Sequence, residues 1–205
     1  MPAYRAILVR LIILINIVVF YFWVSAGSRR VEFMADNFLV SWTALAEGRY
    51  WTLLTSVFSH NMLLHILVNM FVLNSFGSLL EQVLGRVRFV GFYLVAGIVS
   101  SLSHCIISNF VLHQPDQAAL GASGAIAGLI LIFSLVFPKE KILLFGIVPL
   151  PAIWGALAFI GLDLWGLSAQ MGGGGLPIGH GAHLGGAFTG IVYYVFFLRR
   201  RIRRG

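Results

Sequence analysis

Ser123 and His183 are the residues whose types and spacing could carry hydrolytic chemistry. Ser123, in Gly121-Ala122-Ser123-Gly124, precedes Lys139 by sixteen positions, and His183 precedes Arg199 by the same number. Both intervals are apolar and helix-like, so each side chain is expected about 24 Å from the charge that ends its helix. Because a hydrocarbon core is about 30 Å thick, a hydroxyl and an imidazole would share one depth inside a membrane. A histidine that takes the proton of a serine hydroxyl activates it as a nucleophile.

The composition is that of an integral membrane protein. The chain is 59% hydrophobic and 10% charged, whereas soluble domains carry about 25% charged residues. Its 205 residues can hold about six spans and little else, so we expect one all-α membrane domain over residues 1–205. The apolar segments that predict the six transmembrane helices are 7–24, 60–80, 89–110, 123–137, 142–167 and 182–198.

The basic residues gather at the ends of these segments and predict the topology. Six spans place both termini on one side, together with eleven of the fourteen basic residues: Arg5, Arg10, Arg86, Arg88, Lys139, Lys141 and five arginines from Arg199 to Arg204. By the positive-inside rule this multi-pass protein has both termini in the cytosol. The net charge of +7 therefore indicates contact with the lipid bilayer and not with nucleic acid.

The first connection on the other side, residues 25–59, is too long for a plain connector. It mixes apolar side chains with polar ones, which favours one or two interfacial helices lying on the membrane. An irregular loop is the alternative.

A helix that begins at Ser123 would have its amino end inside the membrane, because its apolar stretch to Phe137 is short for a span. Gly121 and Gly124 allow a tight turn and close backbone approach. The first amide groups of such a helix lack partners and its positive end favours negative charge, so the Ser123 backbone amide could bind an oxyanion. The alternative is a packing seam of small residues, with Gly124 and Gly128 as a GxxxG pair.

The segment that carries His183 has one nearly bare face, because Gly186 and Gly190 follow the histidine at helical spacing. That face could pack against the helix that begins at Ser123. An ionisable residue in an apolar span is a functional hypothesis by default. No aspartate lies nearby in sequence, so a Ser–His dyad is the simpler expectation. We interpret Asp163 as an interfacial residue near the outer end of the fifth span, with a gate latch as the alternative.

His65 and Asn69 lie four positions apart and share a helix face. Counted upward from Glu81, His65 reaches the depth of the dyad, so both side chains could stabilise an oxyanion. The alternative is polar contact between membrane helices.

A metal site would draw on His60, His65, His180 and His183. No HExxH motif is present and no carboxylate lies near these histidines in the sequence, so neither a metal nor a cofactor is expected.

At these motifs the chain resembles the rhomboid family of intramembrane serine proteases, close to its compact six-span bacterial form. The matching segments follow the family's order and spacing over about residues 50–190: His60 to Asn69, Glu81 with Gly85-Arg86, Gly121 to Gly124, and Ala182 to Gly190.

The resemblance implies a rhomboid-like fold with Ser123 as nucleophile and His183 as general base. His65, Asn69 and the Ser123 amide would stabilise the oxyanion. The loop from Ser25 would be embedded in the membrane, and the fifth span with the glycine-rich loop after it would form a mobile gate and cap. A bacterial inner membrane suits so compact a form.

Two departures from the family pattern concern the site and the first loop. Many bacterial members have an aromatic residue under the catalytic imidazole, four positions after the serine, where this chain has Ala127. The Trp-Arg pair often found in the first loop is Trp51-Thr52 here, with Arg49 slightly upstream. Because Ala127 stands where the aromatic residue would be, the imidazole is expected to be held less firmly.

The expected function is cleavage of transmembrane segments of other membrane proteins by a serine endopeptidase. Two alternatives stay open. A non-catalytic rhomboid-like protein would bind membrane helices without cleaving them, and a small transporter would use the polar residues as a solute path. Such non-catalytic proteins typically lack the serine or the histidine, and transporters typically show internal repeats.

Overall fold

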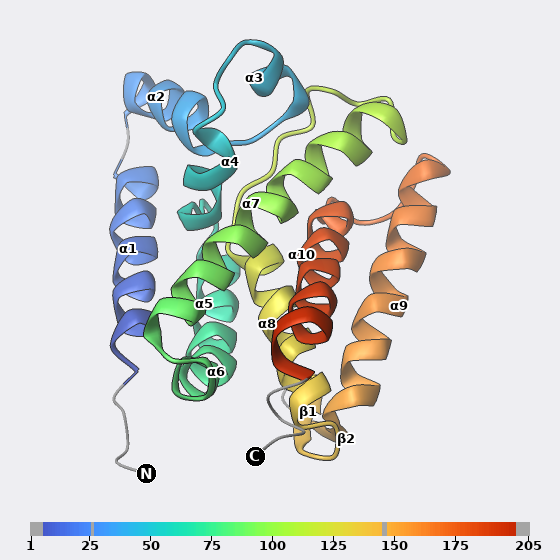
Figure 1. Cartoon of the computed structure of the whole chain (residues 1–205). Helices are drawn as coiled ribbons and strands as arrows, with labels where there is room; N and C mark the ends of the chain where they lie inside the picture. The colour runs from blue at the N-terminus through green and yellow to red at the C-terminus, as the bar shows by residue number, and fades with distance from the viewer. Residues whose placement is uncertain (1–5, 26, 145–146, 200–205) are drawn as a thin grey trace.

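The computed structural model describes residues 6–25, 27–144 and 147–199, and its main elements are helices (Figure 1). The helices are α1 (Ile7–Val24), α2 (Ser28–Phe38), α3 (Trp42–Ala46), α4 (Thr52–Thr55), α5 (Leu63–Val72), α6 (Ser78–Leu84), α7 (Arg86–Phe110), α8 (Ser123–Val136), α9 (Ala152–Met171) and α10 (His180–Tyr193). A 3₁₀ turn (Ser56–Phe58) follows α4, and π-helical turns follow α5 (Leu73–Gly77) and α10 (Tyr194–Leu198).

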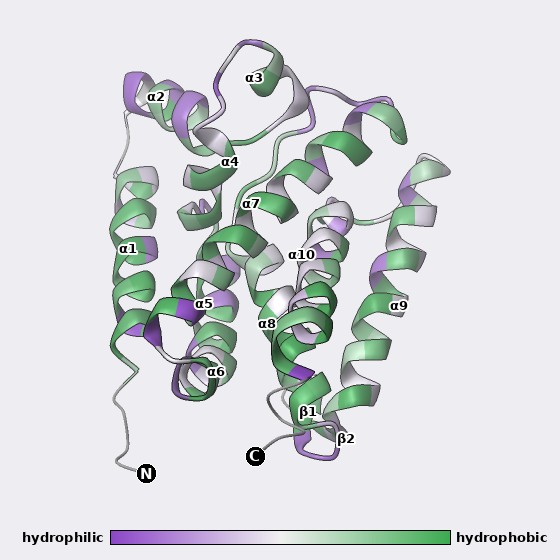
Figure 2. Ribbon diagram, viewed as in Figure 1, coloured by the Kyte–Doolittle hydropathy of each residue, from purple (hydrophilic) through white to green (hydrophobic). Residues whose placement is uncertain are grey.

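The chain is an integral multi-pass membrane protein. Among the described residues, five helices are long and apolar enough to cross a bilayer: Ile7–Val24, Leu63–Leu84, Arg86–Phe110, Ala152–Met171 and His180–Leu198. Apolar residues cover the middle of the long helices, while hydrophilic residues gather on α2 and in the turns at the two ends of the bundle (Figure 2). A sixth apolar helix, α8, has 14 residues.

The start of α1 and the end of α10 lie at the same end of the bundle, which we call the terminal end (Figure 1). Helices α2 and α3 lie at the opposite end, which we call the loop end. Arg5 and the arginines after Arg199 are outside the described residues, so the expected cytosolic side of the termini stays a prediction.

Helix α8 lies at the centre of the bundle and begins well below the loop end (Figure 1). Ten of its residues are buried. It packs against α10 through glycine backbone: a Cβ added at Gly186 would lie 1.8 Å from the carbonyl oxygen of Gly124, and one at Gly190 would lie 2.6 Å from that of Gly128. The short helix is therefore held between α7 and α10, and its amino end lies inside the molecule.

Glu81 is a buried carboxylate that closes the amino end of α1. It accepts hydrogen bonds from the backbone N–H groups of Ile7, Leu8 and Val9 at 3.0, 3.2 and 2.9 Å. The first N–H groups of a helix lack helical partners and favour negative charge. Glu81 thereby joins α1 to α6.

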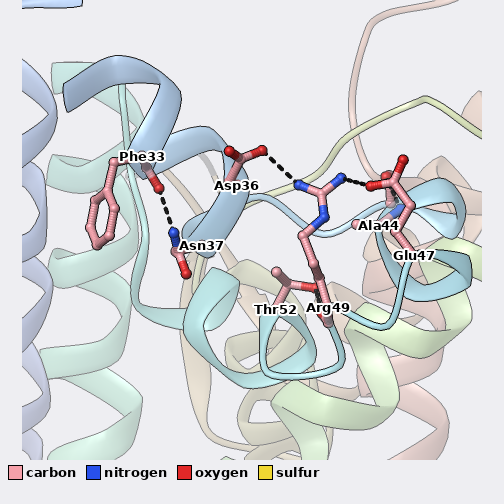
Figure 3. A network of polar contacts seen from close by, with 8 residues as sticks. Phe33, Asp36, Asn37, Ala44, Glu47, Arg49 and Thr52 are labelled. Atoms are coloured by element: carbon pink, nitrogen blue, oxygen red, sulfur yellow. Dashed lines mark hydrogen bonds and ion pairs between the residues drawn. The ribbon is translucent and has the colours of Figure 1, made fainter. Parts of the chain in front are cut away.

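The first connection at the loop end contains short helices and is not an irregular loop. Polar contacts hold it together (Figure 3). Arg49 donates to Asp36 of α2 at 2.8 Å and also pairs with Glu47, while its carbonyl accepts from Thr52 at 2.7 Å. A backbone bridge between Val40 and Ala119 joins this connection to the segment that leads into α8. Residues 27–59 therefore form a folded layer at the loop end, which we call the roof.

The expected fifth span, 142–167, is wrong at its start. Residues Lys141–Leu144 (β1) and Val148–Pro151 (β2) form an antiparallel hairpin, and helix α9 begins only at Ala152. Pro149 and Pro151 explain the difference, because proline lacks an N–H donor and disfavours helical conformation in the residue before it. The apolar composition of this stretch was insufficient to predict a helix there. Residues 145–146 of that expected span are outside the described residues.

The other boundaries shift by a few residues. The second expected span, 60–80, becomes Leu63–Leu84 and contains the π-helical turn. The third begins at Arg86 instead of residue 89, and the sixth at His180 instead of residue 182. Arg86, Arg88 and His180 explain the earlier starts of the third and sixth helices, since such residues lower the local hydropathy without ending the helix.

Candidate functional site

Ser123 and His183 lie within hydrogen-bonding distance of each other. The Oγ atom of Ser123, the first residue of α8, is 2.9 Å from Nε2 of His183 on α10. The close glycine contact between these two helices brings the side chains to one level. A hydroxyl that donates to an imidazole nitrogen is the arrangement that activates serine for attack.

The turn before Ser123 has a backbone shape that suits glycine. Gly121 has φ of +124°, and a Cβ at this position would lie 2.7 Å from Cε1 of His65. Nε2 of His60 accepts a hydrogen bond from the Ala122 backbone N–H at 3.4 Å, and the His60 and His65 rings are 4.8 Å apart between centroids. Two histidines therefore pack against the start of α8, of which the sequence reasoning assigned only His65 to the site.

Asn69 is buried on α5, one turn after His65. Its Nδ2 donates to the His65 carbonyl at 2.9 Å, which uses one of the two N–H groups of the amide. The second N–H is the group that could serve an oxyanion. The structure thus brings His65 against the turn that holds Ser123, and it ties Asn69 to the backbone of His65.

Asp163 of α9 is buried in contact with His183, so the interpretation as an interfacial residue reached by water is wrong. Only 4% of the residue is exposed. Its Oδ1 accepts from Nδ1 of His183 at 3.0 Å and from Nδ1 of His180 at 2.7 Å. The premise that no carboxylate lies near the histidines also fails for these two.

A hydrogen bond from Nδ1 of an imidazole to a carboxylate fixes both the tautomer and the ring orientation. With Nδ1 of His183 protonated and donating to Asp163, its Nε2 carries the lone pair that can accept the proton of Ser123. The observed chain of contacts runs from Ser123 through His183 to Asp163, and His180 adds a second donor to the same carboxylate oxygen.

An aromatic ring also lies against the imidazole, although it comes from a different helix than the family pattern implies. The ring of Phe159 on α9 is 5.4 Å from that of His183 between centroids, at 31° between planes. Phe159 and Asp163 are four positions apart and so share one face of α9. Ala127 is fully buried. Ala127 therefore does not leave the imidazole without support, because α9 supplies both an aromatic neighbour and a carboxylate.

Sequence reasoning missed Asp163, His180 and Phe159 as members of this cluster. One signal could have found them: α9 and α10 are consecutive helices, joined through the glycine run 172–175, so residues equally distant from that run lie opposite each other. Asp163 precedes this run by nine positions and His183 follows it by eight, so the two come close to that relation. Gly166 supports the pairing, since a Cβ there would lie 2.3 Å from the His180 ring.

Comparisons with known proteins agree with this architecture. The rhomboid domain family matches residues 47–200. The chain is 29% identical over 186 residues to RHOMBOID-like protein 12 of Arabidopsis thaliana, covering 85% of this chain and 53% of that protein. It is 35% identical over 147 residues to Rhomboid protein 1 of Saccharomyces cerevisiae, covering 69% and 40%. It is 32% identical over 198 residues to the human presenilin-associated rhomboid-like protein, covering 90% and 47%.

The chain spans about half the length of the curated relatives it matches. All three carry "mitochondrial" in their names, which runs against the bacterial inner membrane expected for a compact form. The family match covers α4 to α10 and every residue of the cluster around Ser123. On these grounds the chain belongs to the rhomboid family.

Proposed function

We propose that this protein is an intramembrane serine endopeptidase that cleaves transmembrane segments of other membrane proteins. The observation that carries the proposal is the 2.9 Å contact between Ser123 Oγ and His183 Nε2, formed by two helices of a membrane bundle. Its partners would be transmembrane protein substrates in the bilayer. We also propose that the terminal end faces the cytosol and the roof the other side, which the distribution of basic residues supports.

The proposed reaction needs only groups of this chain and water. Ser123 attacks the scissile carbonyl while His183 takes its proton, and the same imidazole then protonates the leaving amine. Water hydrolyses the resulting acyl-enzyme by the reverse use of His183. A substrate helix must unwind locally, since a carbonyl paired within a helix is sterically shielded from the nucleophile. Small or helix-breaking residues near the scissile bond are therefore expected in substrates.

Asp163 acts in this proposal as a positioning residue for His183. Its carboxylate holds the imidazole with Nε2 toward Ser123 and stabilises the positive charge that develops when the imidazole accepts a proton. Because Asp163 and Phe159 both lie on α9, the orientation of His183 depends on α9 staying packed against α10. A gate motion of α9 would therefore disturb the base directly.

The oxyanion of the tetrahedral intermediate would be stabilised by the Ser123 backbone amide, His65 and Asn69. Helix α8 begins at Ser123, so its first N–H groups lack helical partners and its positive end faces the developing charge. A full oxyanion donor is worth about 10²–10³ in kcat in soluble proteases.

For Asn69→Ala we expect kcat for substrate cleavage to fall about 10- to 100-fold, with little change in KM. The effect is smaller than for a full donor because one N–H of Asn69 already serves the His65 carbonyl. Steady-state kinetics in proteoliposomes measure it, with Asn74→Ala, an exposed amide on the same long helix, as the matched control. Equal rates for the two variants would remove Asn69 from the oxyanion site.

The function itself is tested with purified protein in proteoliposomes that contain a helical test substrate with a small-residue break. We expect two products from one cut near the roof side, and no product from Ser123→Ala. Ser75→Ala, which changes an exposed serine, should cleave normally. Binding of the substrate without any cut by the wild-type protein would favour a non-catalytic helix-binding function instead.

A further inference from the structure

Asp163, His180 and His183 form a cluster that could bind a metal ion, a capacity that the proposed reaction does not use. One carboxylate oxygen accepts from both imidazoles, and the other, Oδ2, is buried without a hydrogen-bond partner among the described residues. The Asp163 side chain is 6% exposed and that of His180 is 8% exposed. A buried carboxylate oxygen without a partner in a membrane bundle is costly and is a functional hypothesis by default.

We infer that these three residues form a binding site for a divalent transition metal, zinc above all, and that bound zinc switches the proposed protease off. The inhibitory half rests on the proposed function. Two imidazole nitrogens and one carboxylate form a typical zinc ligand set that leaves a fourth position for water. The candidate ligand atoms already lie within 4.8 Å of one another, and a tetrahedral site with bonds of about 2 Å requires about 3.3 Å between them.

Zinc at Nδ1 of His183 excludes base catalysis by the same imidazole. Coordination uses the Nδ1 lone pair, so the single proton of the neutral ring moves by exchange with water from Nδ1 to Nε2. No proton is lost from the ring, but Nε2 then donates to Ser123 Oγ and cannot accept its proton. His180 undergoes the same change of tautomer. The nucleophile is therefore left without a base for as long as the metal stays bound.

The chemistry and position of the ligands define which metal fits. The set favours zinc or cobalt over Mg²⁺ and Ca²⁺, which prefer several oxygen ligands. One ligand comes from α9 and two from α10, so a bound ion would also join the two helices and oppose opening of α9. The ion compensates the buried carboxylate charge, and it gives Oδ2 a direct role if the carboxylate binds through both oxygens.

Binding is tested first without any reference to activity. Untagged Ser123→Ala protein is titrated with Co²⁺, whose visible absorption reports low coordination number. We expect saturable binding with one ion per chain, reversed by zinc and by EDTA but not by Mg²⁺. Adding His180→Gln should weaken binding by at least about 10- to 100-fold, since loss of an outer-shell partner already costs that much and His180 is a direct ligand here. Adding His113→Ala, an exposed histidine outside the cluster, should leave it unchanged.

Inhibition is tested by titrating zinc into the cleavage assay of the otherwise unchanged protein. We expect reversible loss of kcat, and a concentration for half inhibition at least about tenfold higher for His180→Gln, normalised to that variant's own uninhibited rate. Absence of specific Co²⁺ binding overturns the inference, whatever the protease does. Equal zinc sensitivity of His180→Gln and wild type overturns it too, since zinc then acts elsewhere. Metal binding by a protein that never cleaves would instead refute the proposed function and leave only the metal site standing.

Discussion

His183→Ala is expected to lower the rate of substrate cleavage by about 10⁴-fold or more, while the helical bundle stays folded. The imidazole is the group within reach of Ser123 Oγ, at 2.9 Å, and a serine without a base is a weak nucleophile. In soluble serine proteases, loss of the base costs nearly as much as loss of the whole catalytic set. Replacement of the ring by a methyl group removes the contacts to Ser123, Asp163 and Phe159 but leaves the glycine seam between α8 and α10 intact.

The measurement is the cleavage rate in proteoliposomes, with thermal unfolding followed in detergent to show that the variant folds. His113→Ala provides the matched control, because that histidine is exposed in the connection after α7. A rate for His183→Ala within tenfold of the control would contradict the role of base.

Asp163→Asn is expected to lower kcat by at least about 100-fold with KM nearly unchanged. An amide that presents its NH₂ group to His183 favours the wrong tautomer, with the proton on Nε2, and soluble triads lose about 10⁴ in kcat by this change. The loss here is expected to be smaller, because Phe159 and the helix packing also orient the ring. A change confined to kcat is the signature of an orienting residue, since substrate contacts elsewhere are kept.

Two further variants separate positioning from general destabilisation. Asp163→Glu retains a carboxylate and should recover part of kcat, while Ser168→Ala, an exposed position on the same helix, should behave as wild type. If Asn and Glu lower kcat equally, or if both raise KM instead, Asp163 acts through the packing of α9 and not through the imidazole.

Much of the site was predictable from the sequence because the depth of a residue in a membrane can be estimated from its distance along the helix to the charges at the helix end. The charges that end each helix and the fixed rise per residue placed Ser123 and His183 at one level. Gly186 and Gly190 predicted which face of the last helix packs against α8. These inferences use residue spacing within a helix and the thickness of a bilayer. They give the position of a residue across the membrane, but not its neighbours in the membrane plane.

Lateral contacts between spans were less predictable. The position of Asp163 near a span end predicts an interfacial residue, yet its burial follows from the side-by-side packing of α9 and α10, which hydropathy does not encode. An ionisable residue in a span is a functional hypothesis by default, and this holds for Asp163 as it does for His183. Phe159 gave no signal of its own, because an aromatic residue in an apolar helix is ordinary.

The hairpin before α9 was missed for a different reason. A hydropathy window averages over residues 142–151 and finds them apolar, while Pro149 and Pro151 act on the backbone alone. Local backbone chemistry outweighs composition there, and helix α9 begins directly after the second proline.

The most direct test of the central claim is covalent capture of the nucleophile. The wild-type protein in detergent or lipid is treated with a fluorophosphonate, and the modified residue is identified by peptide mass spectrometry. An adduct on Ser123, absent in His183→Ala although Ser123 is still present, is the result that a serine activated by that imidazole predicts. An unmodified Ser123 in wild-type protein, or equal labelling of Ser123 without His183, would contradict it.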